Sequence, residues 1–339
     1  MINEVYRLFA PKQFRVDLVD EQPGPDDVIV RPTYLSVCAA DKRYYLGDRD
    51  QQTLKRKLPM ALIHEAVGKV LSDPMGQYKL GSDVVLLPNT PFVKDDVIHE
   101  NYLPSSHFRS SGYDGFMQSF VVMRRDCVIP FAKADPQTMV MAELMSVGHQ
   151  ALWHFDRVAH QRRQRIGIWG SGNVGFIVAL NLRKMLPDSQ LVLFSVDAKQ
   201  MEYFSFVDEH YLVSEIPDGL RVDHAFECVG GSAAGMVINQ IIDHINPMGT
   251  INLMGVSGDA VGINTRMVLE KGLSLLGTSR STHEDFAAVI DLIDGNEDVQ
   301  QYLSTIINGV VDVKDIKDIY TAFDAALAHP FKTVMRWEI

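Results

Sequence analysis

Three glycines near the middle of the chain constrain the fold more than any other feature of the sequence. They lie in Gly170-Ser-Gly172-Asn-Val-Gly175, which fits the pattern G-x-G-x-x-G, between an apolar run over 165–170 and a helical pattern over 176–185. In a strand–loop–helix unit of this kind, the glycines let the backbone turn tightly and approach a pyrophosphate, which the amide groups at the helix start bind. The context therefore predicts a dinucleotide site. Its expected contacts are the six loop residues, Gly170, Ser171, Gly172, Asn173, Val174 and Gly175.

The sequence after this loop alternates between strand and helix patterns. Apolar runs typical of buried strands recur three times, at 190–195, 223–228 and 250–255. A helical pattern covers 233–245. Such alternation predicts a parallel, doubly wound α/β sheet, the Rossmann fold, over residues 151–283. Gly255 and Val256, at the end of the last of these strands, are included in the predicted cofactor site.

The residue at the end of the second strand indicates which dinucleotide is bound. An acidic residue about 20 positions after the glycines would bind the ribose 2′-hydroxyl of NAD. The residue at that distance from Gly175 is Ser195, which can donate to a 2′-phosphate, and Lys199 can add positive charge. NADPH is therefore the expected cofactor. Two alternatives stay open: Asp197 would favour NAD if the strand ended two residues later, and Lys199 would be a solvated lysine on a helix face.

The rest of the sequence predicts a second, β-rich domain. Its short β-branched runs are bounded by Pro, Gly or Asp and lie at 28–32, 66–71 and 83–88. The polar stretch 89–113 is expected to form a long surface loop, and such loops are often functional. Residues 284–339 suggest two helical segments and a strand that returns to the first domain. We expect a largely antiparallel, barrel-like catalytic domain over 1–150 and 284–339, with the active site in the cleft beside the dinucleotide domain.

Charge and composition exclude several classes of partner. The formal net charge of −11 argues against general binding to nucleic acid or to acidic membranes. The start of the chain lacks the pattern of a signal peptide, and no apolar run reaches the length of a membrane span, about 20 residues. Three cysteines are too few for a disulfide framework. A cytoplasmic protein is expected, in which single Arg and Lys residues must bind any anionic ligand.

Four residues of the β-rich part have side chains suited to a metal ion. Cys38, the pair His64-Glu65 and the later Glu143 offer a thiolate, an imidazole and carboxylates. These groups suit zinc, and a catalytic zinc uses three protein ligands and keeps one position open. Each residue also has a structural explanation. Cys38 could be a small buried apolar residue, His64 a core histidine, and Glu143 a carboxylate favoured at a helix start.

The order of these motifs resembles the zinc-dependent medium-chain dehydrogenases over essentially the whole chain. The matching motifs are Cys38-Ala-Ala-Asp41, His64-Glu65-Ala-Val-Gly, Gly81-Ser-Asp-Val-Val, Asp114-Gly-Phe-Met-Gln, Glu143 and the glycine loop. Within that family, Cys38, the His-Glu pair and a later Glu resemble the polyol (sorbitol-type) branch. Long stretches such as Phe108-Arg-Ser-Ser-Gly-Tyr-Asp and Asn264-Thr-Arg-Met-Val-Leu are similar to the ribulose-5-phosphate reductases, the ribitol-5-phosphate dehydrogenases of teichoic-acid and capsule precursor synthesis.

The resemblance implies a GroES-like catalytic domain and one catalytic zinc per chain. Cys38, His64 and Glu143 would hold the zinc, Glu65 would be a near ligand that exchanges with water or substrate, and Asp41 would orient the site. The implied reaction is the NADPH-dependent reduction of D-ribulose 5-phosphate to D-ribitol 5-phosphate. It further implies a homodimer or homotetramer and a functional link to a cytidylyltransferase that forms CDP-ribitol.

Two positions depart from the family pattern. Ile63 replaces the glycine that usually precedes the His-Glu pair, which should alter packing more than chemistry. Ala40 replaces the usual hydroxyl residue, so a hydroxyl relay at this point is impossible. We expect a zinc-bound water handled by Glu65 to deliver the proton to the product, with Tyr44 as the alternative donor.

The phosphate of the implied substrate requires Arg or Lys within hydrogen-bond reach. Arg43, just after the first metal ligand, is the first candidate, followed by Arg280 and by Arg109 in the long loop. Arg280 matches an arginine that reaches the substrate in polyol relatives. A surface salt bridge is the alternative for each of them.

Three rival functions remain from the sequence. An NAD-linked polyol dehydrogenase could oxidise an unphosphorylated sugar alcohol. A non-catalytic NADPH-binding regulator could keep the fold without the chemistry, although retention of all four candidate ligands argues against it. A zinc-independent quinone-reductase type is disfavoured because that group lacks the Cys and His-Glu motifs.

Overall fold

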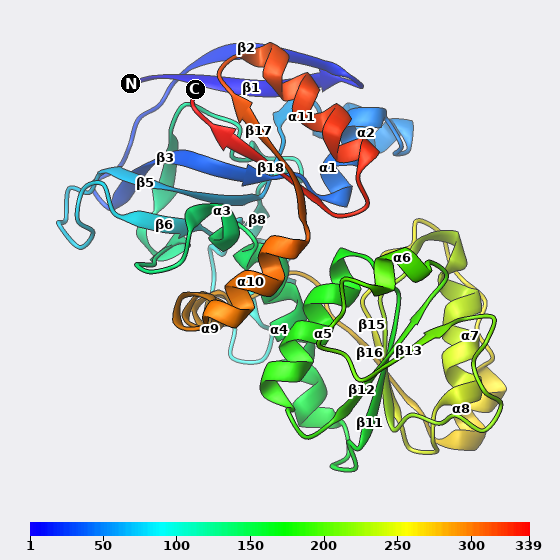
Figure 1. Cartoon of the computed structure of the whole chain (residues 1–339). Helices are drawn as coiled ribbons and strands as arrows, with labels where there is room; N and C mark the ends of the chain where they lie inside the picture. The colour runs from blue at the N-terminus through cyan, green and yellow to red at the C-terminus, as the bar shows by residue number, and fades with distance from the viewer. The chain divides into compact units, whose positions relative to one another are not determined.

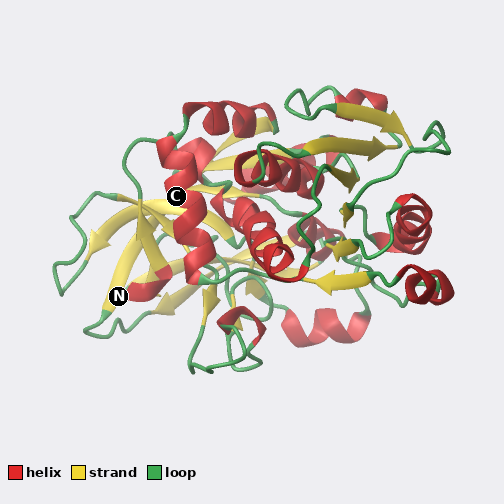
Figure 2. Cartoon of the chain, turned by 90° about the horizontal axis from the view of Figure 1, so that it is seen from below, coloured by secondary structure: helices red, strands yellow, loops and turns green.

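The computed structural model describes all 339 residues, and the chain divides into two compact units (Figure 1). Unit 1 comprises Met1–Ser146 and Arg280–Ile339, and unit 2 comprises Val147–Ser279. Helices, strands and loops all contribute to the structure (Figure 2). None of the helices has the length and hydropathy that crossing a membrane requires.

Unit 2 contains a six-stranded, fully parallel sheet. Its strands are β11 (Arg165–Trp169), β12 (Gln190–Ser195), β13 (Glu209–Leu212), β14 (His224–Glu227), β15 (Thr250–Leu253) and β16 (Ser274–Gly277). They are ordered β13-β12-β11-β14-β15-β16. Counted within the unit, this order is 3-2-1-4-5-6, which is the doubly wound order of dinucleotide-binding domains. The predicted Rossmann fold is confirmed, and the strand order reverses at β11, directly before the glycine loop.

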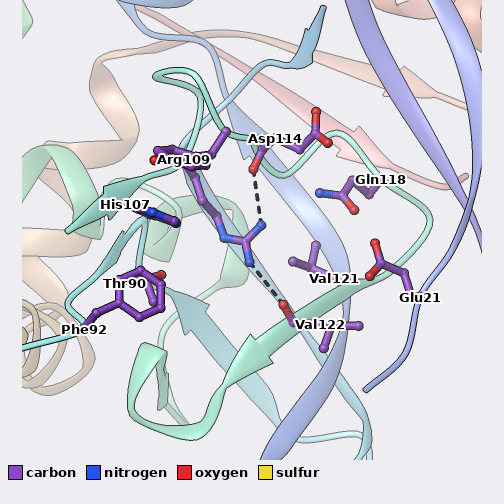
Figure 3. A pocket seen from close by; sticks show the side chains of 10 residues that line it. Glu21, Thr90, Phe92, His107, Arg109, Asp114, Gln118, Val121 and Val122 are labelled. Atoms are coloured by element: carbon purple, nitrogen blue, oxygen red, sulfur yellow. Dashed lines mark hydrogen bonds between the residues drawn. The ribbon is translucent and has the colours of Figure 1, made fainter. Parts of the chain in front are cut away.

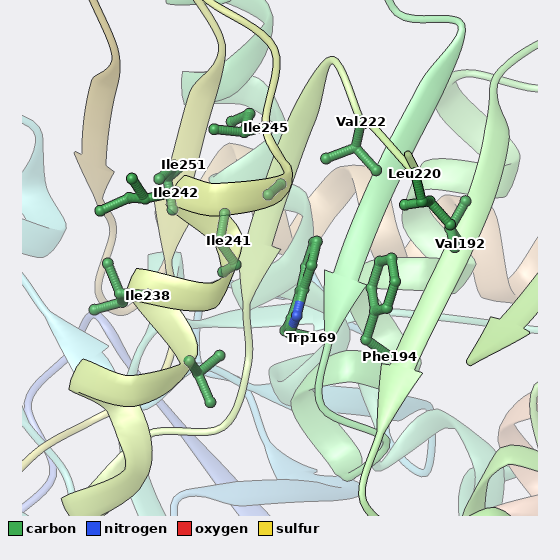
Figure 4. Packing of buried hydrophobic residues seen from close by; sticks show 12 residues of the cluster. Trp169, Val192, Phe194, Leu220, Val222, Ile238, Ile241, Ile242, Ile245 and Ile251 are labelled. Atoms are coloured by element: carbon green, nitrogen blue, oxygen red, sulfur yellow. The ribbon is translucent and has the colours of Figure 1, made fainter. Parts of the chain in front are cut away.

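The core of unit 2 forms between this sheet and its helices. The helices are α5 (Asn173–Met185), α6 (Ala198–Met201), α7 (Ala234–His244) and α8 (Thr265–Lys271), while α4 (Ala142–Val158) spans the unit boundary. Trp169 and Phe194 stack on neighbouring strands with ring centroids 3.9 Å apart. The buried face of α7 presents Ile238, Ile241 and Ile242 to the same cluster (Figure 4). Burial of such side chains stabilises the fold by about 1.5–3 kcal/mol each, so the strand that ends at the glycine loop is firmly anchored.

Unit 1 is dominated by strands. Its two larger sheets have the orders β2-β1-β4 and β10-β6-β5-β3-β18-β17, with β9 also paired to β3, and β7 pairs with β8. The strands are β1 (Ile2–Ala10), β2 (Gln13–Asp20), β3 (Asp27–Ser36), β4 (Met60–Ala61), β5 (Glu65–Ser72), β6 (Asp83–Leu86), β7 (Asn89–Thr90), β8 (His107–Phe108), β9 (Val121–Arg124), β10 (Val128–Pro130), β17 (Ile307–Val313) and β18 (Lys332–Trp337). Most pairings are antiparallel, and the C-terminal β18 pairs with β3. The sheet thereby brings the end of the chain beside its beginning.

The helices of unit 1 range from 4 to 13 residues in length. They are α1 (Ala39–Leu46), α2 (Gln51–Lys57), α3 (Pro136–Met139), α9 (His283–Gly295), α10 (Glu297–Thr305) and α11 (Ile316–Ala328), with 3-10 turns at Glu100–Tyr102 and Arg125–Cys127. The helix α1 begins at the predicted metal ligand Cys38, which is its N-cap. The helix α4 begins one residue before Glu143, the last predicted ligand. Two of the predicted ligands therefore lie at helix starts.

Two expectations for unit 1 need correction. Residues 284–339 form three helices and two strands, rather than two helices and one strand. The strand that the sequence pattern did not reveal, β17, contains Asn308-Gly309, a typical turn signal, and it is held by parallel pairing to β18. The stretch 89–113 is mostly irregular, as expected, but it also contains the β7–β8 ribbon.

Candidate active site

Cys38, His64, Glu65 and Glu143 lie together in unit 1. One ligand atom each from Cys38, His64 and Glu65 fall within 4.8 Å of one another. The Cys38 Sγ is 4.0 Å from His64 Nδ1, and His64 Nε2 is 3.9 Å from Glu143 Oε1. Residues separated by more than 100 positions in the sequence thus offer sulfur, nitrogen and oxygen donors to one small region.

Asp41 fixes the position of Cys38. The Cys38 amide donates to Asp41 Oδ2 at 3.0 Å, and the Asp41 amide donates to Cys38 Sγ at 3.3 Å, which forms a capping box at the start of α1. The other carboxylate oxygen of Asp41 accepts from the Ile63 amide and from Ser110 Oγ, both at 3.0 Å. Asp41 is fully buried. Its hydrogen bonds therefore connect the Cys38 segment with the segment before His64 and with the 108–111 loop.

Ile63 adopts a conformation that explains why a glycine is usual at its position. Its φ is +70°, in the left-handed region that a β-branched residue rarely occupies. Its side chain is fully buried, and its amide is the one held by Asp41. Backbone strain of this kind persists only where surrounding contacts enforce it, and it concentrates at functional sites. Here the strained residue directly precedes His64.

Lys332 is the site residue that the sequence reasoning missed. From the start of β18, its Nζ donates to both carboxylate oxygens of Glu65, at 2.6 Å to Oε2. Only 2% of the Lys332 side chain and 1% of the Glu65 side chain are exposed. A charge so deeply buried requires a partner. Both carboxylate oxygens of Glu65 thus accept hydrogen bonds from Lys332. Glu143, in contrast, lies beside His64 and forms no ion pair with Lys or Arg.

The donor set fits a divalent metal ion such as zinc. Burial, together with the charges of Asp41 and Glu65, raises the pKa of the Cys38 thiol well above its ordinary value. Burial also raises the pKa of Glu143 to about 7. Both groups would lose their protons to solvent on binding a cation of charge +2, because a bound metal ion compensates the charge that burial disfavours. Cys38, His64 and Glu143 would hold the ion, with Glu65 held close by.

The structure places the three predicted phosphate-binding arginines in different surroundings. The Arg280 guanidinium lies 4.7 Å from the ring centroid of Phe108, and that ring lies 5.3 Å from the His64 ring. Arg280 is thereby linked through Phe108 to His64 of the candidate metal site. Arg43 is half-buried on α1, where its Nε donates to the Asp48 carbonyl at 3.5 Å. The predicted proton donor Tyr44 is buried on the same helix.

Arg109 lies in a separate cavity of about 310 Å³ (Figure 3). Its guanidinium donates to the backbone carbonyls of Asp114 and Val122, at 3.2 and 3.1 Å. These contacts hold the side chain against β9 instead of beside Phe108 and His64. The structure therefore does not bring Arg109 together with Arg280.

The glycine loop of unit 2 has the geometry that a pyrophosphate site requires. Gly170 has a φ of +114°, which favours glycine, and a Cβ on Gly175 would lie 1.8 Å from the Gly170 carbonyl oxygen. A Cβ on Gly172, the N-cap of α5, would meet nothing within 4 Å. Gly255 packs against Gly230, where a Cβ would lie 2.2 Å from the Gly230 nitrogen. The loop is thus closely packed on one side and open at the helix start, where a phosphate would bind.

Ser195 is the last residue of β12, as the sequence pattern indicates. Its hydroxyl lies 2.6 Å from Ser171 Oγ, which joins the end of β12 to the glycine loop. Asp197 is the N-cap of α6 and accepts from the amides of Lys199 and Gln200. Lys199 itself is exposed. The Asp197 carboxylate is therefore engaged by its own helix.

The comparisons with known proteins agree with this architecture. The model of the alcohol dehydrogenase GroES-like domain matches residues 24–133, and that of the zinc-binding dehydrogenases matches residues 198–295. The chain belongs to the zinc-binding alcohol dehydrogenase family with a GroES-like domain. This confirms the family resemblance and the predicted combination of a Rossmann sheet with a β-rich domain.

Particular members of the family are similar along their entire length. The ribulose-5-phosphate reductase of Bacillus spizizenii is 48% identical, and the ribulose-5-phosphate reductase 2 of Staphylococcus aureus is 47% identical; each alignment covers 100% of both chains. The crystal structure of S. aureus TarJ in complex with NADPH matches with a TM-score of 0.90 at 42% identity, again over 100% of both chains.

Proposed function

We propose that this protein reduces D-ribulose 5-phosphate to D-ribitol 5-phosphate with NADPH as the hydride donor. The observation that carries the proposal is the grouping of Cys38, His64 and Glu65, with Glu143 beside His64, in a chain that is 47–48% identical over its full length to ribulose-5-phosphate reductases. A zinc ion bound there would act as a Lewis acid on the carbonyl oxygen of the substrate. NADPH, bound at the glycine loop, would supply the hydride.

The chain's own residues have distinct parts in this proposal. Asp41 holds Cys38 through the capping box, and the buried Lys332 fixes the orientation of Glu65. Ala40 has no hydroxyl group, so Glu65 with a bound water stays the predicted route of the proton and Tyr44 the alternative. An unchanged pH–rate profile in Glu65→Gln would count against Glu65.

Substrate profiling tests the proposal against its nearest rival. Initial rates are measured with NADPH and with NADH, each with D-ribulose 5-phosphate and with unphosphorylated D-ribulose. The proposed function predicts the highest kcat/KM for the phosphorylated ketose with NADPH. A preference for NADH and the free sugar would instead identify an NAD-linked polyol dehydrogenase, and inactivity with every pair would favour a non-catalytic role.

Replacing Ser195 by Asp should reverse the preference between the two cofactors. A carboxylate at the end of β12 would repel a 2′-phosphate and accept from a 2′-hydroxyl, so kcat/KM with NADPH should fall by about tenfold to a hundredfold relative to NADH. Steady-state kinetics with both cofactors measure this ratio. Asp197→Ser is the matched control, because serine also caps helices and its cofactor ratio should stay unchanged. A reversal in Asp197→Ser alone would assign the ribose contact to Asp197.

The proposal extends to two further features of the sequence. A homodimer or homotetramer stays the prediction for the assembly, which light scattering of the purified protein tests. A cytidylyltransferase that forms CDP-ribitol is the class of enzyme expected to consume the product.

A further inference from the structure

The 108–111 loop lies along the candidate metal site and contacts several surrounding elements. Phe108 contacts His64 and Arg280, and Ser110 donates to Asp41. Ser111 accepts a hydrogen bond of 2.8 Å from Lys57 Nζ at the end of α2. Two cations from distant parts of the chain, Lys57 and Arg280, therefore meet the same short loop beside the predicted ligands.

A third cation, Arg49, lies on the neighbouring segment. Its guanidinium is 4.4 Å from the ring centroid of the buried Tyr44, which belongs to the same helix as Asp41. The Arg49 Nε is buried and has no hydrogen-bond partner. A buried N–H group without an acceptor is unfavourable by about 1–3 kcal/mol. The protein itself therefore leaves part of the hydrogen-bonding capacity of the Arg49 guanidinium unused.

These cations have no acidic partners within the protein. None of the three residues Arg49, Lys57 and Arg280 forms an ion pair with an Asp or Glu of residues 1–339. Burial, together with the nearby charges of Arg49, Arg56 and Arg280, lowers the pKa of Lys57. Like charges without counter-charges repel one another. This positively charged cluster lies in a chain whose net charge is −11. Such a cluster is stabilised when an anion binds.

The backbone around the cluster is also strained. Only five non-glycine residues of the chain have a positive φ, and Ile63, Ser110 and Arg280 are three of them. Their φ values are +70°, +58° and +62°. Ser110 and Ile63 both donate to Asp41, and Arg280 lies over the Phe108 ring. Strain concentrated at one site indicates that the surrounding structure fixes these residues for a function.

We propose that Arg49, Lys57 and Arg280 form the subsite that binds the phosphate group of the substrate. The half-buried side chains offer a charged donor each, and stacking of the two arginines on Tyr44 and Phe108 limits their motion before the ligand binds. Arg49 and Lys57 are additions to the residues that the sequence indicated. The inference rests on the proposed function for the identity of the sugar, whereas the binding of a phosphate dianion follows from the cluster itself.

Direct binding of inorganic phosphate to the full-length, zinc-loaded protein tests the subsite. Isothermal titration compares wild type, Arg49→Met, Lys57→Met and the matched control Lys55→Met, since Lys55 is an exposed cation two residues from Lys57 on α2. We expect phosphate affinity to fall about tenfold or more in Arg49→Met and Lys57→Met, because each loses a charge-assisted hydrogen bond. Affinity in Lys55→Met should equal that of wild type. Equal affinity in all four proteins, or no phosphate binding by wild type, would overturn the subsite.

Steady-state kinetics separate this inference from the proposed function. In Lys57→Met and Arg49→Met, KM for D-ribulose 5-phosphate should rise about tenfold or more, while kcat/KM for unphosphorylated D-ribulose stays near that of wild type. An equal loss for both ketoses would overturn the subsite, because a general disturbance of the site affects both. A wild type that binds phosphate through Arg49 and Lys57 but does not reduce the phosphorylated ketose would support the subsite and refute the proposed function.

Discussion

Cys38→Ser is expected to lower kcat/KM for D-ribulose 5-phosphate by about a thousandfold or more, since a catalytic metal contributes several kcal/mol to the transition state and each 1.36 kcal/mol is a factor of ten. Serine keeps the N-cap of α1, so the helix should persist while the sulfur donor is lost. Initial rates with NADPH, measured beside the zinc content of the same preparation, test the expectation.

Cys127→Ser is the matched control for this variant. Cys127 is a buried thiol of the same unit, and its Sγ lies 3.7 Å from the Asn89 carbonyl oxygen instead of near His64. The zinc content and the reduction rate of the Cys127→Ser variant should equal those of wild type. If Cys38→Ser retains full activity, Cys38 holds no catalytic metal, and the assignment of the metal site is wrong.

Lys332→Met should destabilise the protein by about 3–5 kcal/mol, which is the usual consequence of leaving one partner of a buried ion pair uncompensated. The methionine fills a similar volume, so the effect arises from the buried Glu65 charge, which loses a donor to both oxygens. The shift in the midpoint of urea-induced unfolding of the full chain measures it.

Two further variants show whether the charge is responsible. Lys332→Met combined with Glu65→Gln should recover much of the lost stability, because the remaining side chain is neutral. Lys69→Met removes a cation from the exposed pair with Asp83, in which 48% of the lysine side chain is exposed. It should lower stability by less than about 1 kcal/mol. A Lys332→Met variant no less stable than Lys69→Met would show that the Glu65–Lys332 pair is dispensable for folding.

Local sequence patterns were sufficient to predict the dinucleotide-binding domain. The strands β11 and β12 are continuous apolar runs, and the second was predicted with its exact bounds. Each is followed by a polar or glycine-containing turn, so its end is visible in the sequence. The parallel order of the sheet then follows from the strand–helix alternation.

The pairings in unit 1 were less predictable because they depend on distant partners. β17 has a turn-like Asn308-Gly309 within it, and its side chains are mostly half-buried, so neither propensity nor periodicity marks it as a strand. Its existence depends on β18, which begins about 20 residues later and pairs with it in parallel. Tertiary pairing of this kind overrides local preference.

The candidate site was predictable only where a motif surrounds the residue. Cys38, His64 and Glu143 were indicated by spacing and by the family resemblance. Lys332 could not be found in this way, because it lies 267 positions from Glu65 and opens an ordinary apolar strand. Arg49 and Lys57 are likewise common residues in the sequence, and only the fold brings Lys57 to the 108–111 loop and stacks Arg49 on the buried Tyr44.

Removal and restoration of zinc test the central claim most directly. The rate of NADPH-dependent reduction of D-ribulose 5-phosphate is measured for the purified protein, after the metal has been removed by chelation, and after one equivalent of zinc has been added back. The proposed site predicts that activity disappears with the metal and returns with one zinc per chain. Undiminished activity in the metal-free protein would contradict a catalytic ion bound by Cys38, His64 and Glu143.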